Sequence, residues 1–131
     1  MRVLLVEDDR LIRFVIASFL RVKGLSVSEA DSGEEALELL QEERFDAIVL
    51  DIDLPGISGF EVAQHVRTNE PRDFNQSHDP EHSQHCTRLI ALTGSIDAGD
   101  PAATRWLNIF DQVLHKPQAP EQVLTAIRAA R

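Results

Sequence analysis

Short runs of hydrophobic residues divide the chain at intervals, and polar residues follow each run directly. Residues 3–6, 47–50 and 89–92 are hydrophobic throughout. Runs without polar alternation are typical of strands buried on both faces, as in a parallel sheet. Residues 25–28 alternate between hydrophobic and polar, which predicts an edge strand with one wetter face. Residues 112–115 are a weaker candidate for a fifth strand.

The interval after the first run has a helical pattern, with hydrophobic residues every three or four positions. Asp9 precedes this pattern as a candidate N-cap, and Gly24 follows it as a stop signal. Phe14 and Phe19 are candidates for the core, and a hydrophobic stripe is the face that a helix usually buries. The residues of the stripe are Leu11, Ile12, Val15, Ile16, Phe19 and Val22.

Capping signals mark the later helix starts. Residues 32–35 and 58–61 each form a capping box, in which a serine is followed three residues later by a glutamate. Asp100 with Pro101 predicts a helix cap and a first-turn proline, and Pro120 opens the last helix. The residues of the last helix that we expect to face inward are Val123, Leu124 and Ile127.

The elements follow the order strand then helix, repeated five times. This order predicts a doubly wound α/β fold, a (βα)5 sandwich in which helices cover both faces of a five-stranded parallel sheet through right-handed crossovers. We expect a single domain over residues 1–131, since this is an ordinary domain size. Residues 69–85 are polar, contain two prolines and are long for a connection, so they predict an exposed insertion.

Metal-type ligands gather in and just after this insertion. They are His78, His82, His85 and Cys86. Their spacing matches no closed zinc signature, and the segment has the composition of a loop. We therefore favour a loop without a metal site.

The composition narrows the classes of function. The formal net charge of −9 argues against nucleic-acid binding by this chain, which requires clustered Lys and Arg. No stretch is long and hydrophobic enough to span a membrane, and residues 1–6 show no secretory signal. The single cysteine, Cys86, excludes an internal disulfide and fits a reducing compartment, so we expect a cytoplasmic location.

Acidic side chains follow two of the hydrophobic runs. Glu7 and Asp8 come directly after residues 3–6, and Asp51 comes directly after residues 47–50. The carboxyl ends of parallel strands meet at one edge of the sheet, so we expect these carboxylates to share one site. Crowded carboxylates need a compensating cation, and Mg²⁺ prefers such hard oxygen ligands.

Further residues at strand ends suit a phosphoryl group. Thr93 offers a hydroxyl donor to a phosphoryl oxygen, and Lys116 offers a point positive charge. A carboxylate such as that of Asp51 can accept a phosphoryl group as an aspartyl phosphate. Pro117 restrains the backbone that presents Lys116, and the peptide bond between the two is a candidate for the cis form.

Four motifs in order along the chain resemble the receiver domains of two-component response regulators. They are residues 5–9 (LVEDD), 50–56 (LDIDLPG), 91–94 (ALTG) and 116–117 (KP). The resemblance covers essentially the whole chain apart from the insertion at residues 69–85. It implies a flavodoxin-like fold with the strand order 2-1-3-4-5, and a role in phosphorelay signal transduction.

The resemblance implies a role for each site residue. Asp51 would be the phosphoacceptor of the domain. Asp8 would bind Mg²⁺ directly together with Asp51, Glu7 would bind it directly or through water, and Asp53 would add its backbone carbonyl. The residues that bind the phosphoryl oxygens and take part in the switch would be Thr93, Gly94 and Lys116.

The resemblance also implies protein partners. The phosphoryl donor would be a phosphohistidine on a sensor histidine kinase or a histidine phosphotransfer protein. The output would be a contact with a downstream protein target, with no membrane or nucleic acid bound by this chain. The domain would be no enzyme beyond modest self-catalysed phosphorylation and dephosphorylation. It would act as a monomer or as a phosphorylation-dependent dimer, alone or within a larger kinase or regulator.

The sequence departs from the pattern of the family at a few positions. An aromatic residue usually stands three positions before the lysine of the fifth strand, and here this position is Val113. Gly94 stands where alanine is frequent, which leaves the pocket roomier. Asn108 stands in for a helix-ending glycine that is usual before the fifth strand. Whether an aromatic side chain takes part in the switch is therefore left open. The movement of Thr93 toward the phosphoryl group is still expected.

Other functions fit parts of the pattern. The motif at residues 51–53 also resembles haloacid-dehalogenase-like phosphatases, but that family usually carries it near the start of a longer chain, and Glu7 and Asp8 would have no role. A Toprim-like domain would explain the acidic residues, but not the negative net charge, Thr93 or the pair at 116–117. An interaction module that has lost phosphorylation would not need the complete set of site residues.

Overall fold

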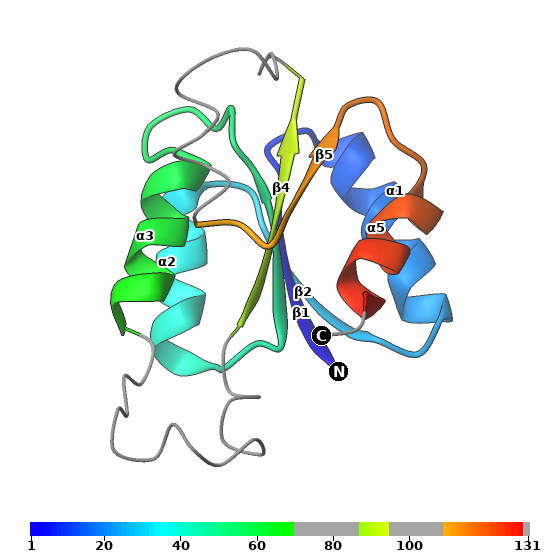
Figure 1. Ribbon diagram of the computed structural model, residues 1–131, viewed down its shortest axis with the longest axis horizontal. Helices are drawn as coiled ribbons and strands as arrows, with labels where there is room; N and C mark the ends of the chain where they lie inside the picture. The colour runs from blue at the N-terminus through cyan, green and yellow to red at the C-terminus, as the bar shows by residue number, and fades with distance from the viewer. Residues whose placement is uncertain (70–86, 95–108, 130–131) are drawn as a thin grey trace.

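The computed structural model describes residues 1–69, 87–94 and 109–129, which form a parallel sheet covered by helices on both faces (Figure 1). The strands are β1 (Arg2–Val6), β2 (Ser26–Ala30), β3 (Ala47–Asp51), β4 (Arg88–Thr93) and β5 (Gln112–His115), in the spatial order β2-β1-β3-β4-β5. The helices are α1 (Arg10–Val22), α2 (Gly33–Glu42), α3 (Gly59–Asn69) and α5 (Pro120–Arg128). The predicted fold and strand order are confirmed.

Several sequence predictions fall outside these residues. The helix expected after Asp100 lies there, as do the four metal-type ligands near residues 78–86 and the substitute for the helix-ending glycine, Asn108. The expected insertion lies there too, apart from Asn69, which ends α3. Among the residues that the structure does describe, no helix is long and hydrophobic enough to cross a membrane.

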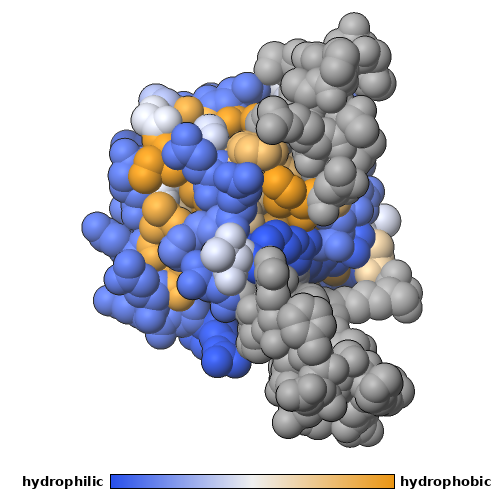
Figure 2. Space-filling model, turned by 60° about the vertical axis from the view of Figure 1, so that its left-hand side comes forward, coloured by the Kyte–Doolittle hydropathy of each residue, from blue (hydrophilic) through white to orange (hydrophobic). Residues whose placement is uncertain are grey.

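The inner strands supply two separate hydrophobic cores, because successive side chains of a strand point to opposite faces of the sheet. On β1, Leu4 and Val6 face α2 and α3, whereas Val3 and Leu5 face α1 and α5. Figure 1 shows these two helix pairs on opposite sides of the sheet. The side with α2 and α3 has a largely hydrophilic outer surface with smaller hydrophobic areas between polar side chains (Figure 2).

The helix ends follow the capping signals. The Asp9 carboxylate accepts hydrogen bonds from the backbone N–H groups of Leu11 and Ile12. This cap begins α1 just beyond the carboxyl end of β1. Gly24 follows α1 with φ +92°, a conformation that glycine adopts without steric cost. The serine hydroxyls at 32 and 58 cap α2 and α3 in the same way as Asp9 caps α1.

The face of α1 that packs on the sheet differs from the predicted stripe. Ile16 and Leu20 are buried against the sheet, with 2% and 0% of their surface exposed. Leu11, Phe14 and Val22 lie on the outer side, with 71%, 65% and 83% exposed, so the prediction of Phe14 as a core residue is wrong. Hydrophobic residues occur all round this helix, and periodicity alone therefore did not decide between the two faces.

Candidate site at the carboxyl ends of the strands

Three carboxylates meet where β1 and β3 end, at the upper edge of the sheet in Figure 1. One carboxylate oxygen each from Glu7, Asp8 and Asp51 lies within 4.8 Å of the others. Glu7 and Asp51 are buried, whereas Asp8 is exposed. The strand ends therefore produce a half-open acidic cluster, with two carboxylates inside and one at the surface.

Lys116 brings a positive charge into this cluster from the loop after β5. Its Nζ lies 2.8 Å from Oε1 of Glu7 and donates a hydrogen bond to Oδ2 of Asp51 at 3.0 Å. The Lys116 backbone N–H donates to the carbonyl of Thr93 at 2.7 Å, which fixes the loop to the end of β4. The following peptide bond, to Pro117, is cis.

The backbone around Asp51 fixes the carboxylate of this residue. The N–H of Asp53 donates to Oδ1 of Asp51 at 3.0 Å, so both carboxylate oxygens of Asp51 accept a hydrogen bond. The N–H of Ile52 donates to the carbonyl of Leu92 on β4. The first residue of α3, Gly59, packs on the Asp51 carbonyl so closely that a Cβ at this position would overlap the carbonyl oxygen. A glycine is therefore required where α3 meets the strand.

Thr93 and Gly94 complete the edge of the site. Thr93 is fully buried at the end of β4, beside the paired strand β5. Gly94 is exposed, and its N–H points to the Asp53 carboxylate at 3.5 Å. Among the described residues, a Cβ on Gly94 would contact only Cβ of Lys116, at 3.9 Å, which leaves space for an alanine. The roomier pocket that the sequence suggested is therefore a difference of one methyl group.

Val113 occupies the position where the family usually has an aromatic residue. It lies opposite Ala91 in the pairing of β5 with β4 and is partly buried against the core on the side of α2 and α3. Phe110 lies just before β5 and is buried in the same core. The hydrophobic volume on this side thus comes from a residue before the strand as well as from the strand itself.

Burial and charge shift the pKa values of the three central groups. Desolvation, together with the neighbouring carboxylate of Asp51, raises the pKa of Glu7 to about 8. Burial also acts to raise the pKa of Asp51, but hydrogen bonds with Glu7, Lys116 and the Asp53 N–H outweigh it and lower this pKa. Burial acts to lower the pKa of Lys116, but the two carboxylates outweigh it and raise this pKa. In the metal-free site, these effects favour a proton on Glu7 over one on Asp51.

The donor set of the cluster fits a hard divalent cation. Oε1 of Glu7 is buried, and the Lys116 ammonium that lies 2.8 Å from it also pairs with Asp51. One ammonium shared by two buried carboxylates, with Asp8 beside them, leaves the negative charge incompletely compensated, which favours a further cation or a proton. Oxygen ligands from Glu7, Asp8 and Asp51 are of the type that Mg²⁺ prefers, and the exposed side of the cluster leaves room for its waters.

The structure also adds a contact to the site that the sequence analysis did not single out. Nη1 of Arg13, on the first turns of α1, donates a hydrogen bond to the backbone carbonyl of Glu7 at 2.7 Å. An arginine on a helix surface is usually a solvated charge, so residue type alone gave no signal. The position of Arg13 could have indicated the contact. It stands four residues after the N-cap Asp9, which places it one turn into α1, near the end of β1.

The fold and the site together define a class: doubly wound α/β proteins with an acidic, lysine-bridged cluster at the carboxyl ends of the parallel strands. The family model described as the response regulator receiver domain matches residues 3–128, and the chain belongs to this family. The family recognised from four motifs is thereby confirmed. Nothing in the comparisons supports the phosphatase-like or Toprim-like alternatives.

Curated relatives include transcriptional regulators. The chain is 39% identical over 130 residues to the transcriptional activator protein ExaE of Pseudomonas putida, covering 98% of this chain and 54% of ExaE. It is 43% identical over 132 residues to the response regulator MprA of Mycobacterium leprae, covering 98% of this chain and 50% of MprA. The chain thus spans about half the length of these relatives.

Solved receiver structures are similar over nearly the whole chain. The chemotaxis response regulator CheY4 of Vibrio cholerae has a TM-score of 0.76 and 29% identity, covering 97% of this chain and 95% of CheY4. The response regulator TrrA of Thermotoga maritima, solved in complex with Mg²⁺ and BeF, has a TM-score of 0.73 and 26% identity, covering 97% of this chain and 96% of TrrA.

Proposed function

We propose that this receiver domain accepts a phosphoryl group on Asp51 from a phosphohistidine of a partner protein. The observation that carries the proposal is the contact of a low-pKa aspartate with a lysine, beside a second buried carboxylate. In the transfer, an Asp51 carboxylate oxygen forms a bond to phosphorus while the bond from phosphorus to the histidine nitrogen breaks. The imidazole leaves, and the product is an aspartyl phosphate.

The surrounding residues have separate roles in this proposal. Glu7, Asp8, Asp51 and the backbone carbonyl of Asp53 would hold Mg²⁺, which neutralises phosphoryl charge when bound. Lys116 binds a phosphoryl oxygen, since its ammonium already lies beside the acceptor carboxylate. The Thr93 hydroxyl and the Gly94 N–H are the further donors at the same edge of the sheet.

The proposed output is a population shift rather than turnover. A phosphoryl group adds about −1.5 to −2 charges and new acceptor oxygens at the edge where β1, β3, β4 and β5 end. Thr93 moves toward these oxygens, and the surface of the neighbouring elements changes with it. Phosphorylation from small donors and hydrolysis of the phosphate are modest reactions of the domain itself.

The proposed partners are proteins in the cytoplasm. The donor is a sensor histidine kinase or a histidine phosphotransfer protein, and the acceptor of the signal is a downstream protein. The exposed hydrophobic residues of α1, which begins next to the acidic cluster, offer a surface for such contacts. We propose one domain over residues 1–131, with the insertion at about 70–85, after α3, and no nucleic-acid contact of its own. It is a monomer or a phosphorylation-dependent dimer.

Intact mass after incubation with a small phosphodonor and Mg²⁺ tests the proposal. We expect the wild type to gain one base-labile phosphoryl group and Asp51→Asn to gain none. Asp46→Asn is the matched control, because Asp46 stands at the other end of β3 and forms hydrogen bonds with Arg2 and Arg88 at the starts of β1 and β4. No gain in the wild type, from small donors or from a panel of phosphohistidine proteins, would instead indicate an interaction module without phosphorylation.

A further inference from the structure

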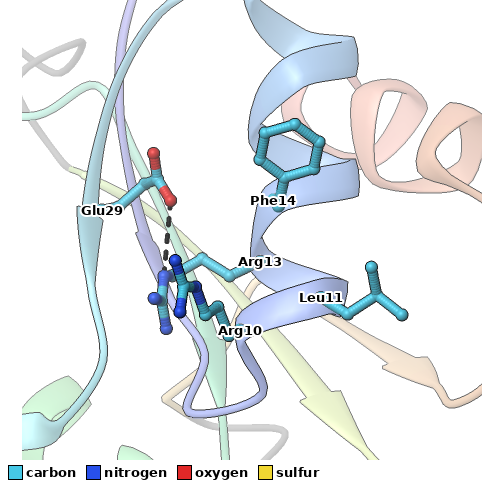
Figure 3. A pocket seen from close by; sticks show the side chains of 5 residues that line it. All are labelled: Arg10, Leu11, Arg13, Phe14 and Glu29. Carbon is cyan, nitrogen blue, oxygen red and sulfur yellow. Dashed lines mark ion pairs between the residues drawn. The ribbon is translucent and has the colours of Figure 1, made fainter.

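A polar network connects the acidic cluster to the edge strand β2 through the first turns of α1. Arg13 lies at its centre, with 17% of its side chain exposed. Nη1 of Arg13 donates to the Glu7 carbonyl at 2.7 Å, and Nε lies 3.3 Å from Oε1 of Glu29. Figure 3 shows Arg13 reaching from α1 toward Glu29 on β2, in a hollow that Arg10, Leu11 and Phe14 also line.

The hydrogen bond from Arg13 fixes the backbone of a proposed metal ligand. The N–H of Glu7 already donates to the carbonyl of Ala30 at 3.1 Å, so the Arg13 bond leaves both backbone polar groups of Glu7 satisfied. Glu7 is fully buried, and its carbonyl would otherwise lack this donor. The same peptide unit leads to Asp8. The orientation of this unit therefore sets the direction of two carboxylates of the cluster.

Glu29 in turn fixes the guanidinium of Arg13. Oε1 of Glu29 pairs with Arg13, and Oε2 pairs with Nη1 of Arg21 at 3.0 Å. Arg21 also donates to the carbonyl of Val27, which keeps it at the far end of β2 and away from the acidic cluster. The two arginines share one partner, but only Arg13 contacts the backbone of the site.

We propose that Arg13 is a positioning residue for the Mg²⁺ site, and that Glu29 keeps Arg13 in place. This inference rests on the proposed Mg²⁺-dependent function. Arg13 contacts no ligand atom of the cluster, so it acts through the Glu7 carbonyl. Partners that orient metal ligands in this way contribute to metal affinity although they lie outside the ligand set.

The sign of the effect separates positioning from simple charge. Arg13 is a cation, so by charge alone its removal would strengthen the binding of Mg²⁺ to the nearby carboxylates. A positioning role predicts the opposite, because the Glu7–Asp8 peptide would lose its fixed orientation. We expect Arg13→Ala to bind Mg²⁺ about tenfold more weakly than the wild type.

Direct Mg²⁺ titration of the full chain, followed by calorimetry and by backbone amide NMR shifts of residues 7–9, gives the test. Arg13→Lys keeps the charge and one donor, so it should recover part of the lost affinity. Arg21→Ala is the matched control: it removes the other arginine of Glu29 and should leave the Mg²⁺ affinity unchanged. The Mg²⁺ concentration that gives half of the maximal phosphorylation rate should be higher for Arg13→Ala than for the wild type. The maximal rate at saturating Mg²⁺ should be the same for both.

Two results would overturn the inference. One is a folded Arg13→Ala variant, checked by thermal unfolding, that binds Mg²⁺ as tightly as the wild type or more tightly. The other is an equal loss of affinity in Arg21→Ala. If Arg13→Ala does not fold, Arg13→Lys decides, since it keeps the charge and should still bind Mg²⁺ more weakly than the wild type, and wild-type binding would refute the role. Loss of wild-type phosphorylation with intact Mg²⁺ binding would count against the proposed function alone.

Discussion

The raised pKa of Glu7 makes Mg²⁺ binding depend on pH near neutrality. Glu7 binds the metal as a carboxylate, so the ion must displace the proton that this residue carries below a pKa of about 8. About one hundredth of the site has an ionised Glu7 at pH 6, and about half has one at pH 8. The apparent Mg²⁺ affinity should therefore rise roughly fiftyfold between these pH values, or about 2.3 kcal/mol, and then level off.

The same pKa predicts how the stability of the metal-free protein changes with pH. The folded pKa of Glu7 lies above the ordinary value of 4.5, so the folded state binds this proton more tightly than the unfolded state does. The resulting stabilisation is complete below pH 4.5 and is lost as the pH rises to about 8. Asp51 has a lowered pKa and acts in a separate window, because its contribution is lost only as the pH falls below 3.8.

Calorimetric titration with Mg²⁺ in buffers of different ionisation enthalpy measures the released protons directly. We expect close to one proton per bound Mg²⁺ at pH 6 to 7 and fewer above pH 8. Glu7→Gln is the control, since it keeps the shape of the side chain and should abolish both the proton release and most of the pH dependence. A wild-type affinity that stays constant from pH 6 to 8, without proton release, would refute the assignment of the proton to Glu7.

Five further variants test the charge of the site and the packing of α1 and α3 by thermal or denaturant unfolding. Lys116→Met leaves two buried carboxylates without their cation and should lower the unfolding free energy of the metal-free protein by about 2–3 kcal/mol. Bound Mg²⁺ should reduce this loss. An unchanged unfolding midpoint without Mg²⁺ would contradict the prediction. Gly59→Ala forces a methyl group against the β3 backbone and should cost about 1–3 kcal/mol, whereas Gly94→Ala should cost less than about 0.5 kcal/mol; equal costs would refute the close approach. Leu20→Ala should cost about 3 kcal/mol and Phe14→Ser less than about 0.5 kcal/mol, and the reverse order would place the wrong face of α1 on the sheet.

The sheet could be predicted from sequence because its inner strands have one possible environment. The runs at residues 3–6, 47–50 and 89–92 are hydrophobic at every position, and a strand buried on both faces is the structure that such short runs satisfy. Because the predicted strands are parallel, the carboxylates that follow them were also expected at one edge of the sheet. The order of the strands came from the resemblance to the receiver family, since the pattern of a strand does not identify its neighbours.

The orientation of α1 could not be predicted in the same way. Its hydrophobic residues occur all round the helix, and the exposed residues Leu11 and Val15 have the same spacing as the buried residues Ile16 and Leu20. Which face of α1 packs on the sheet depends on the direction in which the chain leaves β1 and enters the helix. Asp9, as the N-cap, fixes this entry, but its geometry appears only in three dimensions.

The network around Arg13 was also hidden from sequence, for a related reason. Arg13 and Glu29 stand on different elements, and nothing in their local patterns distinguishes them from solvated surface charges. Only the parallel pairing of β1 with β2 brings Glu29 beside the strand that leads to Glu7. Positioning contacts depend on such pairings, so they are harder to predict than ligands, which chemistry and strand ends already identify.

The charges of the site explain why a proton and a metal ion compete for it. Glu7, Asp8 and Asp51 carry three negative charges when ionised, against one positive charge on Lys116. Without metal, the raised pKa of Glu7 favours a proton there, which reduces this excess. A phosphoryl group on Asp51 would increase the excess again. A single lysine cannot offset it, so the phosphorylated state needs a divalent cation more than the free state does.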